Sequence, residues 1–84
     1  MTKTQRHHNQ WKGWKKEQPS HKERTIMLSR CGQRCFLGKK KSFPICTKKT
    51  CTINKKGVYS AYIRARQTKR YSIAKRAKKL LSSI

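Results

Sequence analysis

Apolar residues recur at helical spacing in the last third of the chain. A first set stands at positions i, i+3, i+4 and i+7: Val58, Ala61, Tyr62 and Ala65. A second set shares one face of the following segment: Ile73, Ala74, Ala77, Leu80 and Leu81. This spacing predicts amphipathic α-helices whose apolar faces pack on the rest of the domain. Residues 58–81 form either one helix or two, with a bend near residues 68–71 and Ser72 as a candidate N-cap.

Upstream of these segments the pattern changes twice. Residues 1–25 are polar and basic without periodicity, so we expect a basic extended arm. The apolar run over residues 26–30 is a strand or a helical turn, and it marks the start of a domain over residues 26–84. Residues 55–57, with the sequence KKG, read as a turn that leads into the first helix. The expected fold is small and α-rich, with a C-terminal basic helix or helical hairpin.

All four cysteines lie within residues 31–51, in a C-x3-C pair and a C-x4-C pair: Cys31, Cys35, Cys46 and Cys51. Apolar side chains stand just inside the two pairs: Phe36, Leu37, Phe43 and Ile45. Between them lie Lys39, Lys40 and Lys41, which cannot be buried without partners. We therefore expect an exposed lysine loop whose base the cysteines hold.

The cysteines admit two structural chemistries. Paired ligands two to four residues apart are a usual way to present zinc, although the tight C-x2-C pair is missing here. Two disulfides are the alternative, with three connectivities that the sequence does not separate. Joining Cys31 to Cys46 and Cys35 to Cys51, for example, would close loops of about 15 residues, each stabilising by roughly 3 kcal/mol. The loose spacing slightly favours disulfides, and four reduced cysteines in the core are a third reading.

The charge balance narrows the class of partner. Of 84 residues, 24 are Lys or Arg, and the acidic residues are Glu17 and Glu23, so the formal net charge is +22. Such self-repulsion opposes compaction unless a polyanion relieves it. The candidate polyanion-binding residues are basic positions of the arm, the lysine loop and the C-terminal segments: Lys12, Lys15, Lys16, Lys39, Lys40, Lys41, Arg64, Arg66, Lys69, Arg70, Lys75, Arg76, Lys78 and Lys79. No apolar run is long enough to span a membrane.

Two tryptophans are interleaved with these lysines. Trp11 and Trp14 suit stacking on bases or anchoring in a pocket of a partner protein, and one of them folding back onto the core is an equal alternative. His7, His8 and His21 do not share spacing with the cysteines and are poor candidates for metal ligands. No catalytic constellation is present in the sequence, so we predict a protein that is not an enzyme.

Three stretches resemble small basic cysteine-containing virion proteins of nucleocytoplasmic large DNA viruses: CFLGKKKSFPIC, KKGVYSAYIRARQ and YSIAKRAKKLL. The resemblance covers about residues 30–81 and leaves the arm outside. It implies a component of a virus particle that is assembled in the host cytoplasm. It implies no activity.

Composition and resemblance together predict a non-enzymatic structural component of a large DNA virus particle. In this reading the chain is a minor capsid protein whose basic arms tie acidic neighbours, capsid proteins or genome, together. Two alternatives fit the composition: a zinc-knuckle ribosomal or other RNA-binding protein, and a viral protein that condenses DNA. Identifying the acidic partner, a capsid protein, RNA or viral DNA, would distinguish these three hypotheses.

Overall fold

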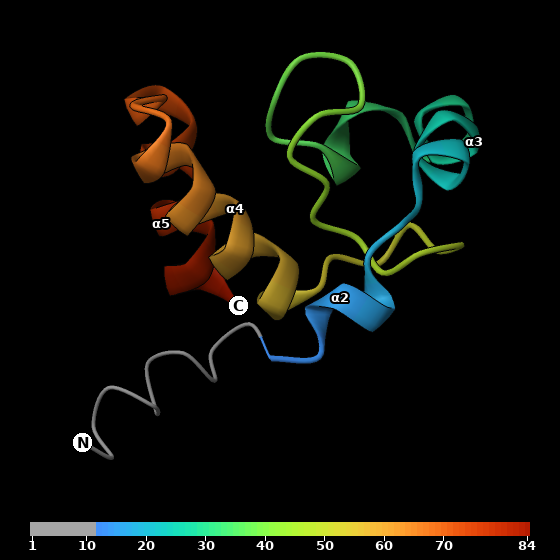
Figure 1. The fold of residues 1–84 in the computed structure, drawn as a ribbon, viewed down its shortest axis with the longest axis horizontal. Helices are drawn as coiled ribbons and strands as arrows, with labels where there is room; N and C mark the ends of the chain where they lie inside the picture. Colours follow the sequence, from blue (N-terminus) through green and yellow to red (C-terminus); the bar gives the residue numbers. More distant parts are fainter. Residues whose placement is uncertain (1–11) are drawn as a thin grey trace.

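Four α-helices and one 3-10 helix follow one another along residues 12–84, the part of the chain that the computed structural model describes (Figure 1). They are α2 (Trp14–Glu17), α3 (His21–Cys31), η2 (Gly32–Cys35), α4 (Lys55–Gln67) and α5 (Tyr71–Ser83). The stapled segment lies between α3 and α4, and α4 and α5 lie side by side. The expected small helical fold with a cysteine staple and a C-terminal helical hairpin is confirmed.

Helix α3 begins earlier than the sequence analysis expected because Ser20 and Glu23 form a capping box. The Ser20 hydroxyl accepts a hydrogen bond from the Glu23 amide at 3.2 Å, and the Glu23 carboxylate accepts one from the Ser20 amide at 2.8 Å. These bonds satisfy two amides that a helix start leaves open. An extended arm is therefore wrong for residues 14–17 and 21–25, which are helical, and α3 crosses the boundary expected after residue 25. Residues 1–11 lie outside the described residues.

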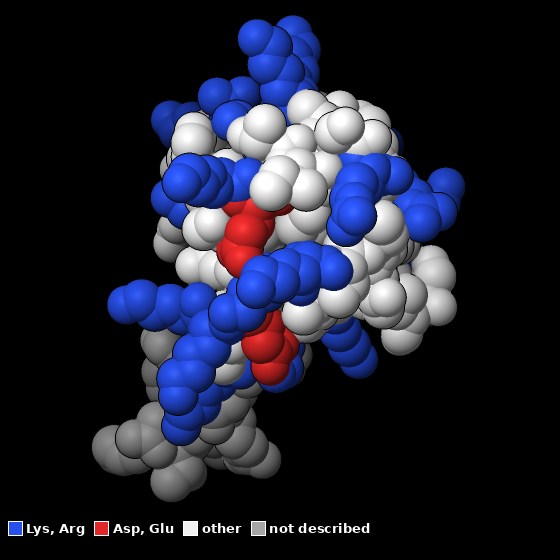
Figure 2. Space-filling model, turned by 90° about the vertical axis from the view of Figure 1, so that its right-hand side faces the viewer, with Lys and Arg blue, Asp and Glu red and all other residues white. Residues whose placement is uncertain are grey.

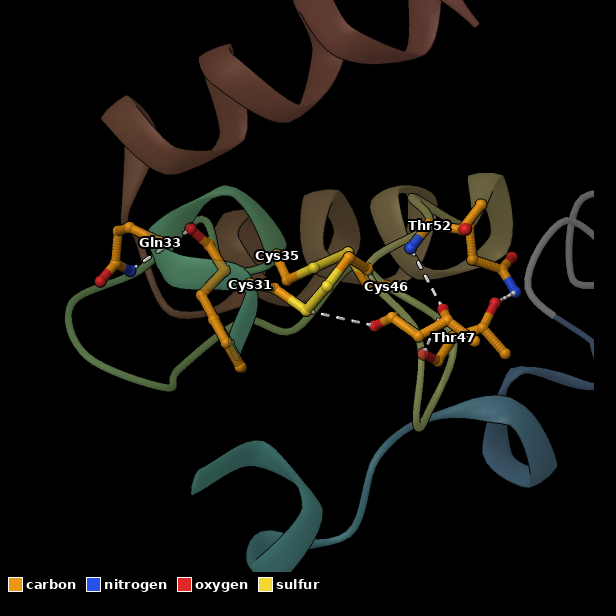
Figure 3. The surroundings of a disulfide bond; sticks show 10 residues. Cys31, Gln33, Cys35, Cys46, Thr47 and Thr52 are labelled. Atoms are coloured by element: carbon orange, nitrogen blue, oxygen red, sulfur yellow. Dashed lines mark hydrogen bonds between the residues drawn. A yellow bond between two sulfur atoms is a disulfide. The ribbon is translucent and has the colours of Figure 1, made fainter. Parts of the chain in front are cut away.

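Two nested disulfides hold the middle of the chain. Cys31 is joined to Cys51 and Cys35 to Cys46, with Cα–Cα distances of 5.4 and 5.1 Å. Figure 3 shows the two bridges side by side. Antiparallel pairing of Phe36 with Pro44 aligns the two sides of the segment, so facing cysteines meet. The crossed pairing, Cys31 with Cys46 and Cys35 with Cys51, does not form.

The lysine loop projects from this staple as predicted. Lys39 and Lys40 are exposed, and the Ser42 amide closes the turn on the carbonyl of Lys39 at 3.1 Å. The Gln33 side-chain amide donates to the carbonyls of Gly38 at 2.7 Å and Lys40 at 2.9 Å. One side chain of η2 thereby satisfies two backbone acceptors of the loop and fixes its path.

Helix α4 starts at Lys55, so residues 55–57 are helical and the predicted turn is wrong. The Asn54 side chain caps the helix by accepting a hydrogen bond from the Lys56 amide at 2.9 Å. Gly57 is needed inside the helix for space, because a Cβ there would lie 2.6 Å from Cη2 of Trp14. The missing side chain lets α2 dock directly on α4.

The predicted bend between the two C-terminal segments is a Schellman turn, and it separates two helices. The Arg70 amide donates to the carbonyl of Ala65 at 2.8 Å, and the Lys69 amide to that of Arg66 at 3.2 Å. Lys69 takes the left-handed conformation, with φ 59°, at the position where glycine is usual. Arg70 is the N-cap of α5, so Ser72 lies inside the helix and does not cap it.

The core consists of two clusters. The first joins the stapled loop to the hairpin, with these buried residues: Leu37, Ile45, Val58, Ala61 and Ala77. The second joins the disulfides to α3: Met27, Cys35, Phe36 and Cys46. The two apolar stripes predicted from helical spacing thus face the staple and each other.

Candidate polyanion-binding surface

The predicted basic residues lie on α2, the lysine loop, α4, α5 and the turn that joins the last two helices. Lys12, Lys15 and Lys16 belong to α2 and the turn before it, and residues 39–41 form the loop tip. The hairpin carries the rest: Arg64, Arg66, Lys69, Arg70, Lys75, Arg76, Lys78 and Lys79. All are exposed except Lys41, which is half-buried. Figure 2 shows basic side chains projecting around the face on which α3 lies.

The two glutamates of the chain are half-exposed and are engaged by groups of the domain itself. Glu17 forms an ion pair with Lys56 at 2.9 Å and accepts a hydrogen bond from Asn54 at 2.8 Å, and these partners lower its pKa. The backbone hydrogen bond from Ser20 lowers the pKa of Glu23. Both carboxylates are therefore stabilised in the charged form. Neither compensates the large excess of positive charge on the surface.

Some candidate side chains have fixed positions. The Arg66 guanidinium lies 5.6 Å from the ring centroid of Tyr62 and donates to its hydroxyl at 3.2 Å. Arg76 Nη1 donates to the carbonyl of Leu37 at 3.1 Å, and Lys41 Nζ to Thr25 Oγ1 at 2.7 Å. A neutral partner leaves each charge uncompensated, so these groups present cations at defined places.

Two of the predicted residues meet a third that the sequence analysis missed. Arg64 and Arg70 line a hollow of about 360 Å³, and Arg24 of α3 lines it with them. Arg24 lay in the expected arm and was not a candidate. Only the helical path of α3 brings it to the hairpin, and the capping box of Ser20 and Glu23 was the sequence signal for that path.

Trp14 does not serve as a free anchor. Its side chain is only 5% exposed and packs on Gly57. A partner pocket can receive it only if α2 leaves α4, so the prediction that Trp14 anchors the chain to a neighbour is wrong. The role of Trp11 stays a prediction, because this residue lies outside the described range.

The disulfides use all four cysteines, so no thiolate remains for zinc. Within residues 12–84, no group of three or more His, Cys, Asp or Glu side chains is placed to hold a metal ion. His21 is the first residue of α3, and His7 and His8 lie outside the described range. The cysteines are structural cross-links.

An apolar hollow of about 380 Å³ lies beside the outer disulfide. Ile26, Met27, Cys31 and Cys51 line it, and the Ile26 side chain is 56% exposed. The sequence predicted residues 26–30 as the start of the domain and gave no indication of a hollow there. This hollow is an apolar patch on a surface that otherwise carries mostly basic side chains.

No protein-family model, curated protein or solved structure matches this chain. The resemblance of residues 30–81 to virion proteins therefore stays a prediction. None of the helices within residues 12–84 has the length and apolar character needed to cross a membrane.

Proposed function

We propose that this protein is a non-enzymatic structural component of a large DNA virus particle that ties polyanionic neighbours together, above all nucleic-acid phosphates. The observation that carries the proposal is the distribution of charge. Exposed Lys and Arg side chains occur on α2, the lysine loop, α4 and α5, while the two half-exposed glutamates are engaged by Lys56 and by the Ser20 amide. The viral setting rests on the resemblance of residues 30–81 alone.

This distribution suits bridging better than recognition of one sequence. A domain that reads bases presents one helix or ribbon to one groove, with side chains aimed at base edges. In this protein the exposed cations are spread over α2, the lysine loop, α4 and α5, and no single helix carries them all. Contacts to phosphates from several sides neutralise charge and carry no sequence information.

Binding of labelled duplex DNA at several salt concentrations tests the proposal. About six phosphate contacts predict a slope near −5 in log affinity against log salt concentration. Duplexes of different sequence should bind within about threefold of one another, and energy transfer between two differently labelled duplexes should appear when protein is added. A slope near zero, a strong sequence preference or one duplex per protein without bridging would contradict it.

The apolar hollow favours a second candidate, a minor capsid protein that docks on a neighbouring protein. An exposed isoleucine beside an apolar hollow offers the kind of apolar contact on which protein interfaces are centred. Ile26→Lys should then reduce incorporation into particles at least tenfold and leave DNA affinity unchanged. Ser29→Lys, at an exposed position of α3 that does not line the hollow, is the control for added charge. Normal incorporation of Ile26→Lys would exclude this candidate.

A further inference from the structure

Three arginines from separate parts of the chain line one hollow. Arg24 comes from α3, Arg64 from α4 and Arg70 from the N-cap of α5. Figure 1 shows α3 and α4 on opposite sides of the stapled loop, and the long arginine side chains of these two helices reach the same hollow. Among the described residues that line the hollow, none is acidic.

Like charges are held close to one another here. Arg24 is half-buried, and burial followed by the nearby Arg64 guanidinium lowers its pKa. Its Nε donates to the carbonyl of Pro19 at 3.4 Å, which keeps the side chain against the domain. Both glutamates have partners elsewhere. An anion in the hollow would offset this repulsion.

The remaining walls suit an oxyanion. Gln18 and Ser60 contribute an amide and a hydroxyl to the lining. Trp14, Phe43 and Ala61 add apolar side chains to the lining. Arginine presents a rigid fork of N–H donors that matches phosphate oxygens two at a time.

We propose that Arg24, Arg64 and Arg70 form a discrete phosphate-binding site whose ligand is a phosphodiester group of a nucleic-acid backbone. The inference rests on the proposed function only for the source of the phosphate. The site fixes one phosphate in the hollow that the three arginines line. It therefore gives the bound nucleic acid a defined position on a protein whose other basic contacts are diffuse.

The test is a titration of the ¹⁵N-labelled oxidised protein with inorganic phosphate, at constant ionic strength kept with chloride. We expect saturable shifts centred on the Nε–H signals of the three arginines and the amide of Ser60. Arg24→Gln should weaken this binding at least tenfold, because one charge-assisted set of hydrogen bonds is lost. Arg34→Gln, at an exposed arginine of η2, removes the same charge and should change the affinity less than twofold.

Arg64→Gln and Arg70→Gln, at exposed positions, provide two further variants, and circular dichroism checks that each remains folded. Shifts spread evenly over all basic residues would overturn the site. Equal weakening by Arg24→Gln and Arg34→Gln would overturn it as well. Either result leaves the salt-dependent binding of duplex DNA as a separate measurement, so the two proposals fail independently.

Competition identifies the source of the phosphate. An oligonucleotide without terminal phosphates should displace inorganic phosphate from the wild-type site. Titrated directly in the absence of phosphate, it should shift the Arg64 and Arg70 Nε–H signals with at least tenfold weaker affinity in Arg24→Gln than in the wild type. Displacement by a 5′-mononucleotide alone would overturn the backbone assignment, since only a terminal monoester would then fit.

Discussion

The stapled segment (residues 31–54) and the C-terminal hairpin (α4 and α5) are both folded, but different interactions stabilise them. Residues 31–54 contain no helix after η2 and are held by two disulfides, isolated strand pairs and the Gln33 amide. The hairpin of α4 and α5 has no cross-link and depends on small and aliphatic side chains at helical spacing. The difference shows how a chain with few apolar residues can fold: cross-links stabilise where side-chain burial is too small.

Removing the inner bridge should have the largest effect. Replacing Cys35 and Cys46 with Ala is expected to lower the free energy of unfolding by about 3 kcal/mol in the chain-entropy model. Amide exchange over residues 36–46 should accelerate more than exchange within α4 and α5, because this stretch contains no helix and its short-range backbone pairing is limited to isolated bridges. Denaturant unfolding and hydrogen exchange measure both quantities. An equal loss of protection in the hairpin would show that the two regions form one cooperative unit.

The hairpin should gain stability where its turn is strained. Lys69→Gly is expected to raise the free energy of unfolding by about 0.5–1 kcal/mol, because glycine adopts the left-handed conformation without the penalty of a Cβ. Lys78→Gly, at an exposed position inside α5, is the matched control and should destabilise by about 1 kcal/mol. Thermal unfolding of both variants tests this. If both variants changed the free energy of unfolding in the same direction, the left-handed conformation of residue 69 would not explain the effect of Lys69→Gly.

The ion pair that attaches α2 to α4 should have the smallest effect. Folding lowers the pKa of Glu17 below its ordinary value of 4.5, so its stabilising contribution is complete above that pH and is lost as the pH falls further. Glu17→Gln should therefore lower the melting temperature slightly at pH 6. At pH 3 the difference from wild type should be smaller. An equal difference at both values would assign the effect to packing.

Local signals predicted the hairpin well. Val58, Ala61 and Ala65 are buried as their spacing indicated, because helical period alone decides which face turns inward. The bend was placed correctly, but its cause was not visible, since Lys69 carries no preference for the left-handed region. The capping box of Ser20 and Glu23 was present in the sequence and was outweighed by the basic composition around it.

Properties that depend on tertiary approach could not be predicted. The disulfide pairing follows from the antiparallel contact of Phe36 with Pro44, which no local pattern specifies. The hollow needs Arg24 from α3 and Arg64 from α4, and these residues are far apart in the sequence. Sequence reasoning therefore found where the charge lies and missed which cations converge.

The nested arrangement of the bridges has a consequence for oxidative folding. When Cys35 and Cys46 join, the outer cysteines are separated from that bridge by only three residues on one side and four on the other. The outer ring is then closed across roughly half the original chain length, which reduces its closure entropy by about 0.6 kcal/mol. Formation of the inner disulfide thus makes the outer disulfide easier to form. A newly synthesised chain can therefore form Cys35–Cys46 first and Cys31–Cys51 second, and no segment has to pass through a closed ring.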